Sequence, residues 1–488
     1  MVPIYRKPLR IFPDAKRVVA RYFVPGGENR IQSVVDHVLK LSPEQVKKNL
    51  QQVLAQYSDR HRSITHILLK NFERIVVDGQ LNKNLVEKLS QQQRLLLGAY
   101  FTMEYSIEAA AFFNPSIVED PDQSGTTAGE KKVILSFRAV GEGHISSLVF
   151  RDGILDKKNN LKFIKSRNST VDMPEKIERH VYEKDKFIQK MREMELPEKI
   201  CELAEKKLKD TFIYGELQDC LEKCATNGQL SESDQTRLPH VNWLAKSHYE
   251  ITFSMDTAIS ERVIFPVSYR ETKGIEDCRF VRFVDEAGEV AYYATYTAYN
   301  GFAILPKIIE TKDFYKFKVS PVHGPNVQNK GLALFPRKIK GQYAMLSRID
   351  GINNYLMYSK DVSVWPEKAV RIQEPEQPWE FVQIGNCGSP VETPEGWLLI
   401  THGVGPMRQY CLGAILLDLE NPAKVIGKLK EPLIVPNEDE REGYVPNVVY
   451  SCGNIIHNDD LVIPYGMSDY CSTYAVVPLK KLMKELKK

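Results

Sequence analysis

One repeated pattern limits the possible fold more than any other feature of the chain. A short stretch of alternating apolar and polar residues is followed by a second such stretch, most often across a polar turn, as in a hairpin. Units of this kind begin at Ile134, Tyr292, Tyr343, Trp397 and Leu461. The last four starts lie about 50 to 65 residues apart, which is the period of a four-stranded propeller blade. The pattern predicts a mainly β fold, a five-bladed β-propeller, with a β-sandwich bearing appended helices as the second choice.

The spacing between the first two units is too long by about 100 residues, which predicts an insertion in the first blade. Residues 174–210 are strongly charged with helical periodicity, and residues 219–225 continue the pattern. We therefore expect a helical insertion at about residues 155–245. It either covers one face of the sheets as a lid or only decorates the surface.

The region before the first repeat has helical periodicity instead. Helices are expected over residues 43–57, 64–75 and 84–111, and Ser42 before Pro43 is typical of a helix start. The predicted domains are a helical N-terminal domain at 1–111 and a catalytic propeller at 112–488. The last helix has a broad apolar face, which packs on its own chain or forms a homo-oligomer contact.

Composition excludes some classes of function. The formal net charge of +3 over 488 residues gives no support for a nucleic-acid partner. The first ten residues lack the apolar core of a signal peptide, and no apolar run approaches a membrane-spanning length. Eight cysteines are scattered without a zinc-binding pattern. We expect a cytoplasmic protein with reduced thiols, no metal and no membrane partner.

The stretch Gly274-Ile-Glu-Asp-Cys-Arg-Phe280 is the strongest single candidate for chemistry. It places Glu276 and Asp277 just before Arg279, next to an alternating strand pattern. A carboxylate at the mouth of a strand, with a cation nearby, can be held in one protonation state for acid or base catalysis. Taken alone, the same residues are also typical of a solvated turn with a local ion pair.

Polar residues at equivalent edges of the successive units support a common site. They are Asn114, Ser116, Arg138, Asp277, Arg279, Lys330, Arg348, His402, Tyr410 and Asp469. Amide and guanidinium groups beside aromatic rings suit a sugar, whereas converging Lys, Arg and His suit an anion such as phosphate. Each also has a structural interpretation. His402 could bond a turn carbonyl, Lys330 could be a solvated cation, and Arg348 could pair with an aspartate at 350 or 361.

An ordered series of short motifs resembles glycoside hydrolase family 130, the β-mannoside phosphorylases and related β-mannosidases. The resemblance runs from about Phe112 to the end, apart from the insertion. Its motifs lie at 113–116, 274–279, 329–336, 345–348, 388–393, 396–404, 443–449 and 465–469. It implies a five-bladed propeller with the site at its axis. Two positions depart from the usual pattern: Cys278 stands where many members have Pro, and Gly331 where they have Asn or Asp.

The resemblance also implies roles for the candidate residues. Asp277 matches the general acid, and Lys330, Arg348 and His402 match the phosphate-binding positions. The sugar-binding set is Asn114, Ser116, Arg138, Arg279, Tyr410 and Asp469. We expect inverting phosphorolysis of a β-mannoside to α-mannose 1-phosphate, with inorganic phosphate as co-substrate and no cofactor.

Two alternatives stay open at this stage. An inverting β-mannosidase on the same fold would need a carboxylate base opposite the acid, for which Glu392 and Glu442 are available. A non-catalytic sugar-binding propeller is the alternative of another class. The linkage, β-1,2 or β-1,4, and the acceptor, mannose, glucose or N-acetylglucosamine, depend on loops outside the motifs.

Overall fold

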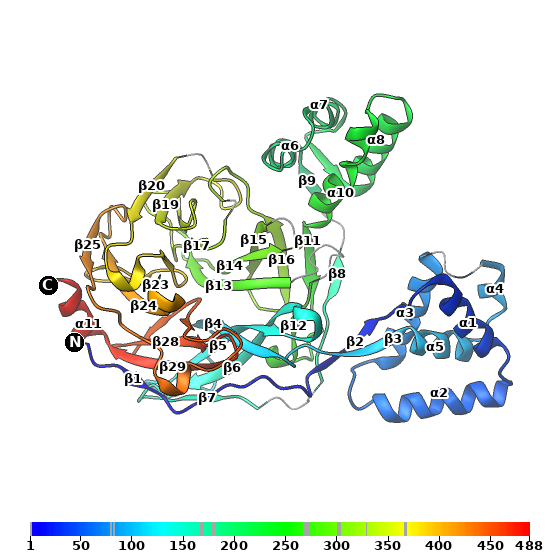
Figure 1. The fold of residues 1–488 in the computed structure, drawn as a ribbon, viewed down its shortest axis with the longest axis horizontal. Coiled ribbons are helices and arrows are strands. Elements are labelled where there is room, and N and C mark those ends of the chain that lie inside the picture. Colours follow the sequence, from blue (N-terminus) through cyan, green and yellow to red (C-terminus); the bar gives the residue numbers. More distant parts are fainter. Residues whose placement is uncertain are drawn as a thin grey trace.

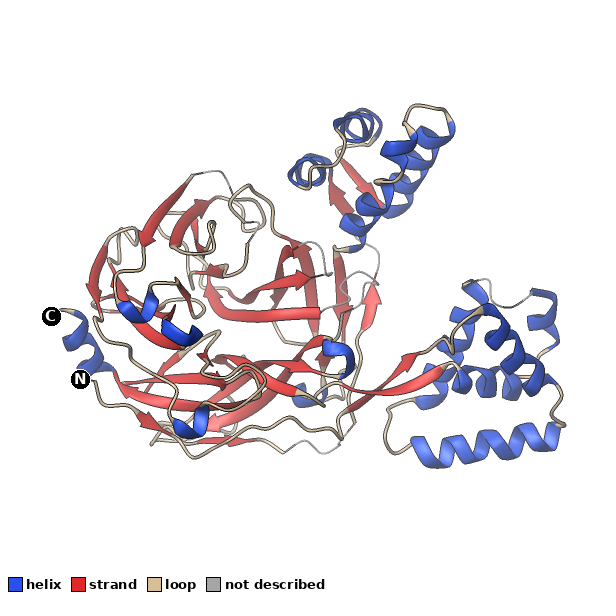
Figure 2. Cartoon of the chain, viewed as in Figure 1, coloured by secondary structure: helices blue, strands red, loops and turns tan. Residues whose placement is uncertain are grey.

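The computed structural model describes residues 2–488 apart from 79–80, 82, 166–169, 178–180, 267–273, 300–303, 328 and 366–367. The chain is mainly β, as expected, and its antiparallel sheets lie together in one large body (Figures 1 and 2). Two helical regions project from this body on one side. Among the described residues, no helix is long and apolar enough to cross a membrane.

The first helical region follows a short N-terminal stretch. Its helices are α1 (Glu28–Leu39), α2 (Pro43–Tyr57), α3 (Ile64–Val77), α4 (Lys83–Lys88) and α5 (Gln91–Tyr100). Helix α2 begins where the sequence predicts, because Ser42 and Gln45 form a capping box. The single helix expected over 84–111 is wrong. Ser90 caps a new helix with Gln93, and α5 ends at Tyr100.

A two-stranded ribbon joins these helices to the sheets. It pairs β2 (Val18–Tyr22) with β3 (Thr102–Ser106), so residues expected to be helical form a strand instead. The stretch before the ribbon does not belong to the helices. Strand β1 (Tyr5–Arg6) pairs with the last strand of the chain, and Ile11 bridges Ser472 beside it. The first eleven residues thus pack with the C-terminal sheet, which differs from the predicted boundary of 1–111.

The sheets form five groups of strands that follow one another along the chain. The first is β4 (Ala111–Glu119), β5 (Lys131–Val140) and β6 (Ser146–Leu155), with β7 (Leu161–Phe163) and β12 (Val263–Ile264) on β6. The second is β13 (Gly274–Val284), β14 (Val290–Tyr299), β15 (Ile304–Thr311) and β16 (Lys316–Pro321). A parallel bridge between Ser146 and Gly274 joins these two groups.

The other three groups are separate sheets. The third is β17 (Ala333–Leu334), β18 (Tyr343–Ser347), β19 (Asn354–Ser359) and β20 (Ala369–Gln373). The fourth is β21 (Gln383–Asn386), β22 (Val391–Thr393), β23 (Gly396–Val404), β24 (Tyr410–Leu417) and β25 (Val425–Lys428). The fifth is β26 (Val449–Tyr450), β27 (Ile455–His457), β28 (Asp460–Met467) and β29 (Cys471–Pro478), completed by β1. Each predicted two-strand unit is an antiparallel pair within one of these groups.

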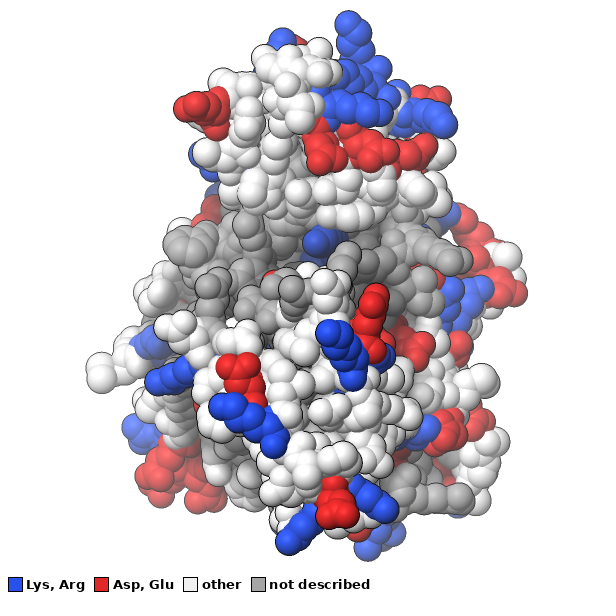
Figure 3. Space-filling view, turned by 90° about the vertical axis from the view of Figure 1, so that its right-hand side faces the viewer, with Lys and Arg blue, Asp and Glu red and all other residues white. Residues whose placement is uncertain are grey.

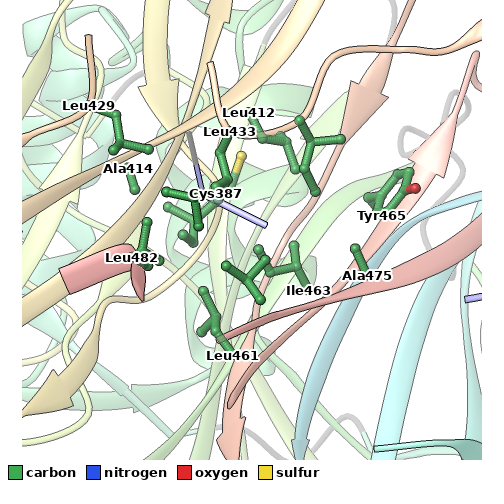
Figure 4. Close-up of a cluster of buried hydrophobic side chains, with 14 of the residues drawn as sticks. Cys387, Leu412, Ala414, Leu429, Leu433, Leu461, Ile463, Tyr465, Ala475 and Leu482 are labelled. Carbon is green, nitrogen blue, oxygen red and sulfur yellow. The ribbon is translucent and has the colours of Figure 1, made fainter. Parts of the chain in front are cut away.

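Apolar side chains fill the spaces between neighbouring groups. One such core lies between the fourth and fifth groups and the C-terminal helix α11 (Leu479–Leu486), with Leu412, Ile463 and Leu482 among its members (Figure 4). Burial of this continuous apolar surface is the main force that holds the sheets together. All eight cysteines are buried free thiols, in agreement with the expectation of reduced cysteines.

The insertion leaves the first sheet group after β7 and carries its own core. Its elements are β8 (Glu175–Ile177), β9 (Val181–Glu183), α6 (Lys184–Glu193), α7 (Glu198–Lys207), β10 (Thr211–Ile213), α8 (Tyr214–Thr226), α9 (Glu232–Gln235), α10 (Leu238–Lys246) and β11 (Tyr249–Thr252). Strand β11 pairs with β8 and with β16, so the insertion is rooted on the second group. Figure 3 shows basic and acidic side chains side by side on its surface, as expected for a solvated face.

Candidate active site

Two β-bulges place the central pair of candidate residues. Strand β4 is irregular between Phe113 and Ser116, and β13 is irregular between Glu276 and Arg279. Asn114 and Asp277 stand inside these bulges with φ near 51° and 52°, a conformation that non-glycine residues seldom adopt. A bulge re-aims a side chain that a regular strand would direct elsewhere. Here Asn114 Nδ2 donates a hydrogen bond to Asp277 Oδ1 at 2.7 Å.

The two bulged strands are locked to each other by Ser116. Its buried hydroxyl oxygen accepts the backbone N–H of Phe280 on β13 at 3.1 Å. Gly453 lies against the same hydroxyl, since a Cβ there would be 2.5 Å from Ser116 Oγ. Ser116, predicted to bind sugar, is thus engaged in fixing the strand that carries Asp277.

Asp277 lies in a field of positive charge. Burial favours the neutral acid, but the charges of Arg138, Arg279 and Lys330 and the Asn114 hydrogen bond outweigh burial and lower the pKa of Asp277. Arg138 Nη1 lies 3.6 Å from Asp277 Oδ1. Without a ligand, Asp277 is therefore a carboxylate at neutral pH.

Glu276 connects two of the candidate cations. Its Oε1 accepts from Arg138 Nη2 at 2.9 Å, and its Oε2 accepts from Lys330 Nζ at 2.5 Å. Glu276 belongs to the motif at 274–279, but no role was predicted for it. Lys330 is therefore held toward Asp277 by an ion pair and is not a free loop cation.

The second part of the site surrounds His402 on β23. This side chain is fully buried, and its ring stacks on Tyr410 with centroids 6.0 Å apart. Burial, then the charges of Arg348 and Arg279, hold the pKa of His402 well below its usual value, so the ring is neutral. Nδ1 lies 3.8 Å from Cys387 Sγ, and Nε2 has no hydrogen-bond partner within the described part of the chain. A hydrogen bond between the ring and the backbone of Asn386 opposes this lowering of the pKa without reversing it.

Arg348 lies beside His402 and is positioned by two glycines. A Cβ on Gly331 would be 2.9 Å from Arg348 Cδ, and one on Gly385 would be 2.3 Å from His402 Cε1. Gly331 also has φ near 91°, so the departure from the family pattern at this position makes room for the arginine. Arg348 Nη2 donates to the Gly351 carbonyl at 2.6 Å, while its buried Nε has no partner among the described residues.

The two aspartates considered as partners of Arg348 are engaged elsewhere. Asp350 accepts backbone N–H groups of its own turn and the Tyr355 hydroxyl, and Asp361 pairs with Lys186 of the insertion. No ion pair to Arg348 is formed by either one among the described residues. The arginine is thus available to an anion.

Tyr450 joins the two halves of the site, and it was not among the predicted site residues. Its hydroxyl accepts a hydrogen bond from Arg279 Nη2 at 2.7 Å, and its ring lies 4.8 Å from the His402 ring. Burial raises the pKa of Tyr450 well above its usual value, so the hydroxyl keeps its proton. Its position directly after the motif at 443–449 was the only available signal.

Asp469 and Tyr410 complete the predicted set. Asp469 stands in the turn between β28 and β29, where burial and then the charge of Asp277 raise its pKa to about 6. It therefore shares the electrostatic environment of Asp277. Tyr410, at the start of β24, accepts a hydrogen bond from Gln383 Nε2 at 3.2 Å.

Glu392 and Glu442 are the two carboxylates considered as the base of a hydrolase. Glu392 forms a bidentate ion pair with Arg337 and is paired with Trp397, at the start of β23. His402 is five residues further along the same strand, or about 17 Å at the usual rise per residue. Glu392 is therefore at the wrong end of the sheet. Glu442 is exposed on the loop before β26.

Comparisons with known proteins find relatives among the β-mannoside phosphorylases. The model of glycoside hydrolase family 130, described as beta-1,4-mannooligosaccharide phosphorylase, matches residues 247–488. A 1,2-beta-oligomannan phosphorylase of Thermoanaerobacter sp. strain X514 is 34% identical over 219 residues, covering 44% of this chain and 71% of that protein. A beta-1,2-mannobiose phosphorylase of Listeria innocua serovar 6a is 28% identical over 230 residues, covering 46% and 63%.

The solved structure of beta-1,2-mannobiose phosphorylase from Listeria innocua, in complex with beta-1,2-mannobiose, is also similar. It is 20% identical, with a TM-score of 0.46, over 78% of this chain and 93% of that one. The family model begins at residue 247, so Asn114, Ser116 and Arg138 lie outside its match. Their inclusion in the site depends on their contacts with Asp277 and its strand.

Proposed function

The chain belongs to glycoside hydrolase family 130, and on that premise we propose that it is an enzyme that cleaves β-mannosides by inverting phosphorolysis. The observation that carries this proposal is a pair of buried nitrogens, Arg348 Nε and His402 Nε2, that have no hydrogen-bond partner among the described residues, in a site whose carboxylate is surrounded by cations. The products are α-mannose 1-phosphate and the shortened saccharide. The related phosphorylases described above support the same reaction class.

We propose that the five sheet groups are the five blades of a propeller and that the site lies at its axis. The regular order of the groups along the chain supports this arrangement. Pairing of β1 with β29 would let the first strand complete the last blade. Such closure leaves fewer exposed sheet edges.

In the proposed mechanism, Asp277 protonates the leaving oxygen, directly or through a sugar hydroxyl. Its lowered pKa means that the ligand-free enzyme holds it as a carboxylate. A bound phosphate adds negative charge beside Arg348 and Lys330, which cancels part of the field and raises the pKa of Asp277. Phosphate binding thus favours the protonated acid that the reaction needs.

Phosphate is proposed to bind to Arg348, His402 and Lys330. Cys387 Sγ lies 3.8 Å from His402 Nδ1, and burial raises the pKa of Cys387 to about 12, so its thiol keeps its proton. In the proposed complex the neutral ring carries its proton on Nε2 and donates it in a hydrogen bond to a phosphate oxygen. The phosphate attacks the anomeric carbon from the face opposite the leaving group and needs no general base. No metal or other cofactor is proposed.

Arg348→Met is expected to raise the KM for phosphate about 10- to 100-fold, because a charge-assisted hydrogen bond contributes about 1.5–3 kcal/mol. The KM for the mannoside should change much less. Initial rates at varied phosphate and saturating saccharide measure this. Arg337→Met is the matched control, because this arginine pairs with Glu392 and lies over the Trp397 ring at the opposite end of β23 from His402. A rise in the saccharide KM alone would contradict the phosphate role.

The experiment that tests the reaction is product analysis with β-1,2- and β-1,4-mannobiose, each with and without phosphate. Mannose 1-phosphate that forms only with phosphate is the expected result. Free mannose at equal rates in both would show a β-mannosidase, with Glu442 as the carboxylate to test as its base. Binding without turnover would show a non-catalytic sugar-binding protein. The assay also identifies the linkage.

The homo-oligomer expected through the N-terminal helices and the cytoplasmic location stay predictions. Light scattering on the full chain and on a variant lacking residues 28–100 would test the first.

A further inference from the structure

Exposed apolar side chains gather at the end of the fourth sheet group that faces the site. Phe381 and Val382, directly before β21, are 63% and 59% exposed, and Met407 in the β23–β24 turn is 89% exposed. Isolated apolar residues on a surface need no explanation. A cluster of them at the edge of a polar site is typical of a binding surface.

Backbone pairing fixes this cluster close to His402. The Val382 N–H donates to the Val404 carbonyl at 3.0 Å, which continues the β21–β23 pairing by one residue. Val404 lies two residues beyond His402 on β23, or about 7 Å along the strand. Met407 follows in the turn after Val404, so all three exposed side chains belong to the end of the sheet that carries His402.

A polar link makes this surface continuous with the site. Gln383, next to Val382, donates to the Tyr410 hydroxyl at 3.2 Å, and the Tyr410 ring stacks on His402. A ligand that reaches out of the site therefore meets Tyr410 and Gln383 first, and then the apolar side chains.

The turn that presents Phe381 is held by buried contacts. Trp379 occupies the space left by two glycines, because a Cβ on Gly403 or on Gly413 would lie 2.5 Å from its ring. Buried Glu380 accepts the N–H groups of residues 376 and 377 and pairs with Lys428 at 3.2 Å. A surface fixed in advance loses little conformational entropy when it binds a ligand. Phe381 is exposed despite this rigid support, which is unexpected for a purely structural aromatic.

We propose that Phe381, Val382 and Met407 form an outer sugar-binding surface for a manno-oligosaccharide. This inference rests on the proposed phosphorolysis. Because that reaction releases a terminal mannosyl unit as its 1-phosphate, the rest of the saccharide is the leaving part and extends from the site toward solvent. The C–H face of a pyranose ring is apolar and stacks on an aromatic ring, while its hydroxyls reach the Tyr410–Gln383 pair. The surface favours saccharides longer than the disaccharide.

The test compares substrates of different length with the linkage that the product assay identifies. Phe381→Ala and the double variant with Met407→Ala are assayed on the disaccharide, trisaccharide and tetrasaccharide. We expect kcat/KM for the longer substrates to fall about three- to tenfold, the size of one aromatic contact, with the disaccharide unchanged within about twofold. Tyr100→Ala, which removes a half-exposed aromatic from the helical region, is the control.

Equal losses on all three substrates, or no loss on any, would overturn the outer surface while leaving phosphorolysis intact. If the unaltered enzyme forms no mannose 1-phosphate from any substrate, the proposed function fails, and the inference fails with it. Thermal unfolding of each variant shows that the changes act on binding and not on folding.

Discussion

Replacing Asp277 with asparagine is expected to lower kcat for phosphorolysis about 100- to 10,000-fold, the usual contribution of one well-placed acid. Asparagine keeps the shape and can still bond Asn114, but it has no proton to give to the leaving oxygen. The measurement is the initial rate of mannose 1-phosphate formation at saturating phosphate. Near-normal turnover by this variant would rule out Asp277 as the acid.

The stability of the Asp277→Asn variant gives a second, independent test. Because the pKa of Asp277 is lowered on folding, its charge stabilises the folded state above the unfolded pKa, and this contribution is lost as pH falls through the folded pKa below 3.8. The asparagine variant should therefore unfold more easily than the wild type at pH 7. The difference should shrink as the pH is lowered into that range. Asp59→Asn, on an exposed turn of the helical region, is a control for the effect of charge removal.

The strand pairs could be predicted from the sequence because they are local. Alternation of apolar and polar residues records which face of a strand is buried, and a turn records where the chain reverses. Pairing of β1 with β29 joins residues more than 460 apart and leaves no such local trace. The helix expected over 84–111 failed for a related reason. Its apolar residues belong to two elements, the helix α5 and the strand β3, in which buried side chains recur with different periods.

The sequence predicted which residues form the candidate site, but not how these residues are arranged in space. Motif resemblance brought Asp277 and Arg138 onto one list, yet the bulges that turn Asp277 toward Asn114 depend on register between distant strands. Glu276 and Tyr450 were missed because their roles are contacts with other chain segments. Gly331 illustrates the reverse case, since its departure from the family pattern is explained only by the nearby Arg348 side chain.

A second large effect, on the stability of the fold, is expected at Glu440, which is not one of the site residues. This fully buried carboxylate accepts hydrogen bonds from Arg6 on β1 at 3.1 Å, from the Tyr465 hydroxyl on β28 at 2.6 Å and from the Asn437 N–H at 3.1 Å. It therefore ties the N-terminal strand to the C-terminal sheet. Glu440→Ala is expected to lower the free energy of unfolding by about 3–5 kcal/mol, because it removes three hydrogen bonds to a buried charged group, each worth about 1.5–3 kcal/mol and not fully additive, and leaves the buried Tyr465 hydroxyl without this acceptor. Urea unfolding followed by tryptophan fluorescence measures the loss.

Two comparisons separate this role from a general loss of charge. Glu438→Ala removes an exposed carboxylate from the same short helix and should change stability by no more than about 0.5 kcal/mol. Arg6→Met should cost a comparable amount, because it leaves the buried Glu440 carboxylate without its cationic partner. Equal stability of the Glu438 and Glu440 variants would show that Glu440 does not hold β1.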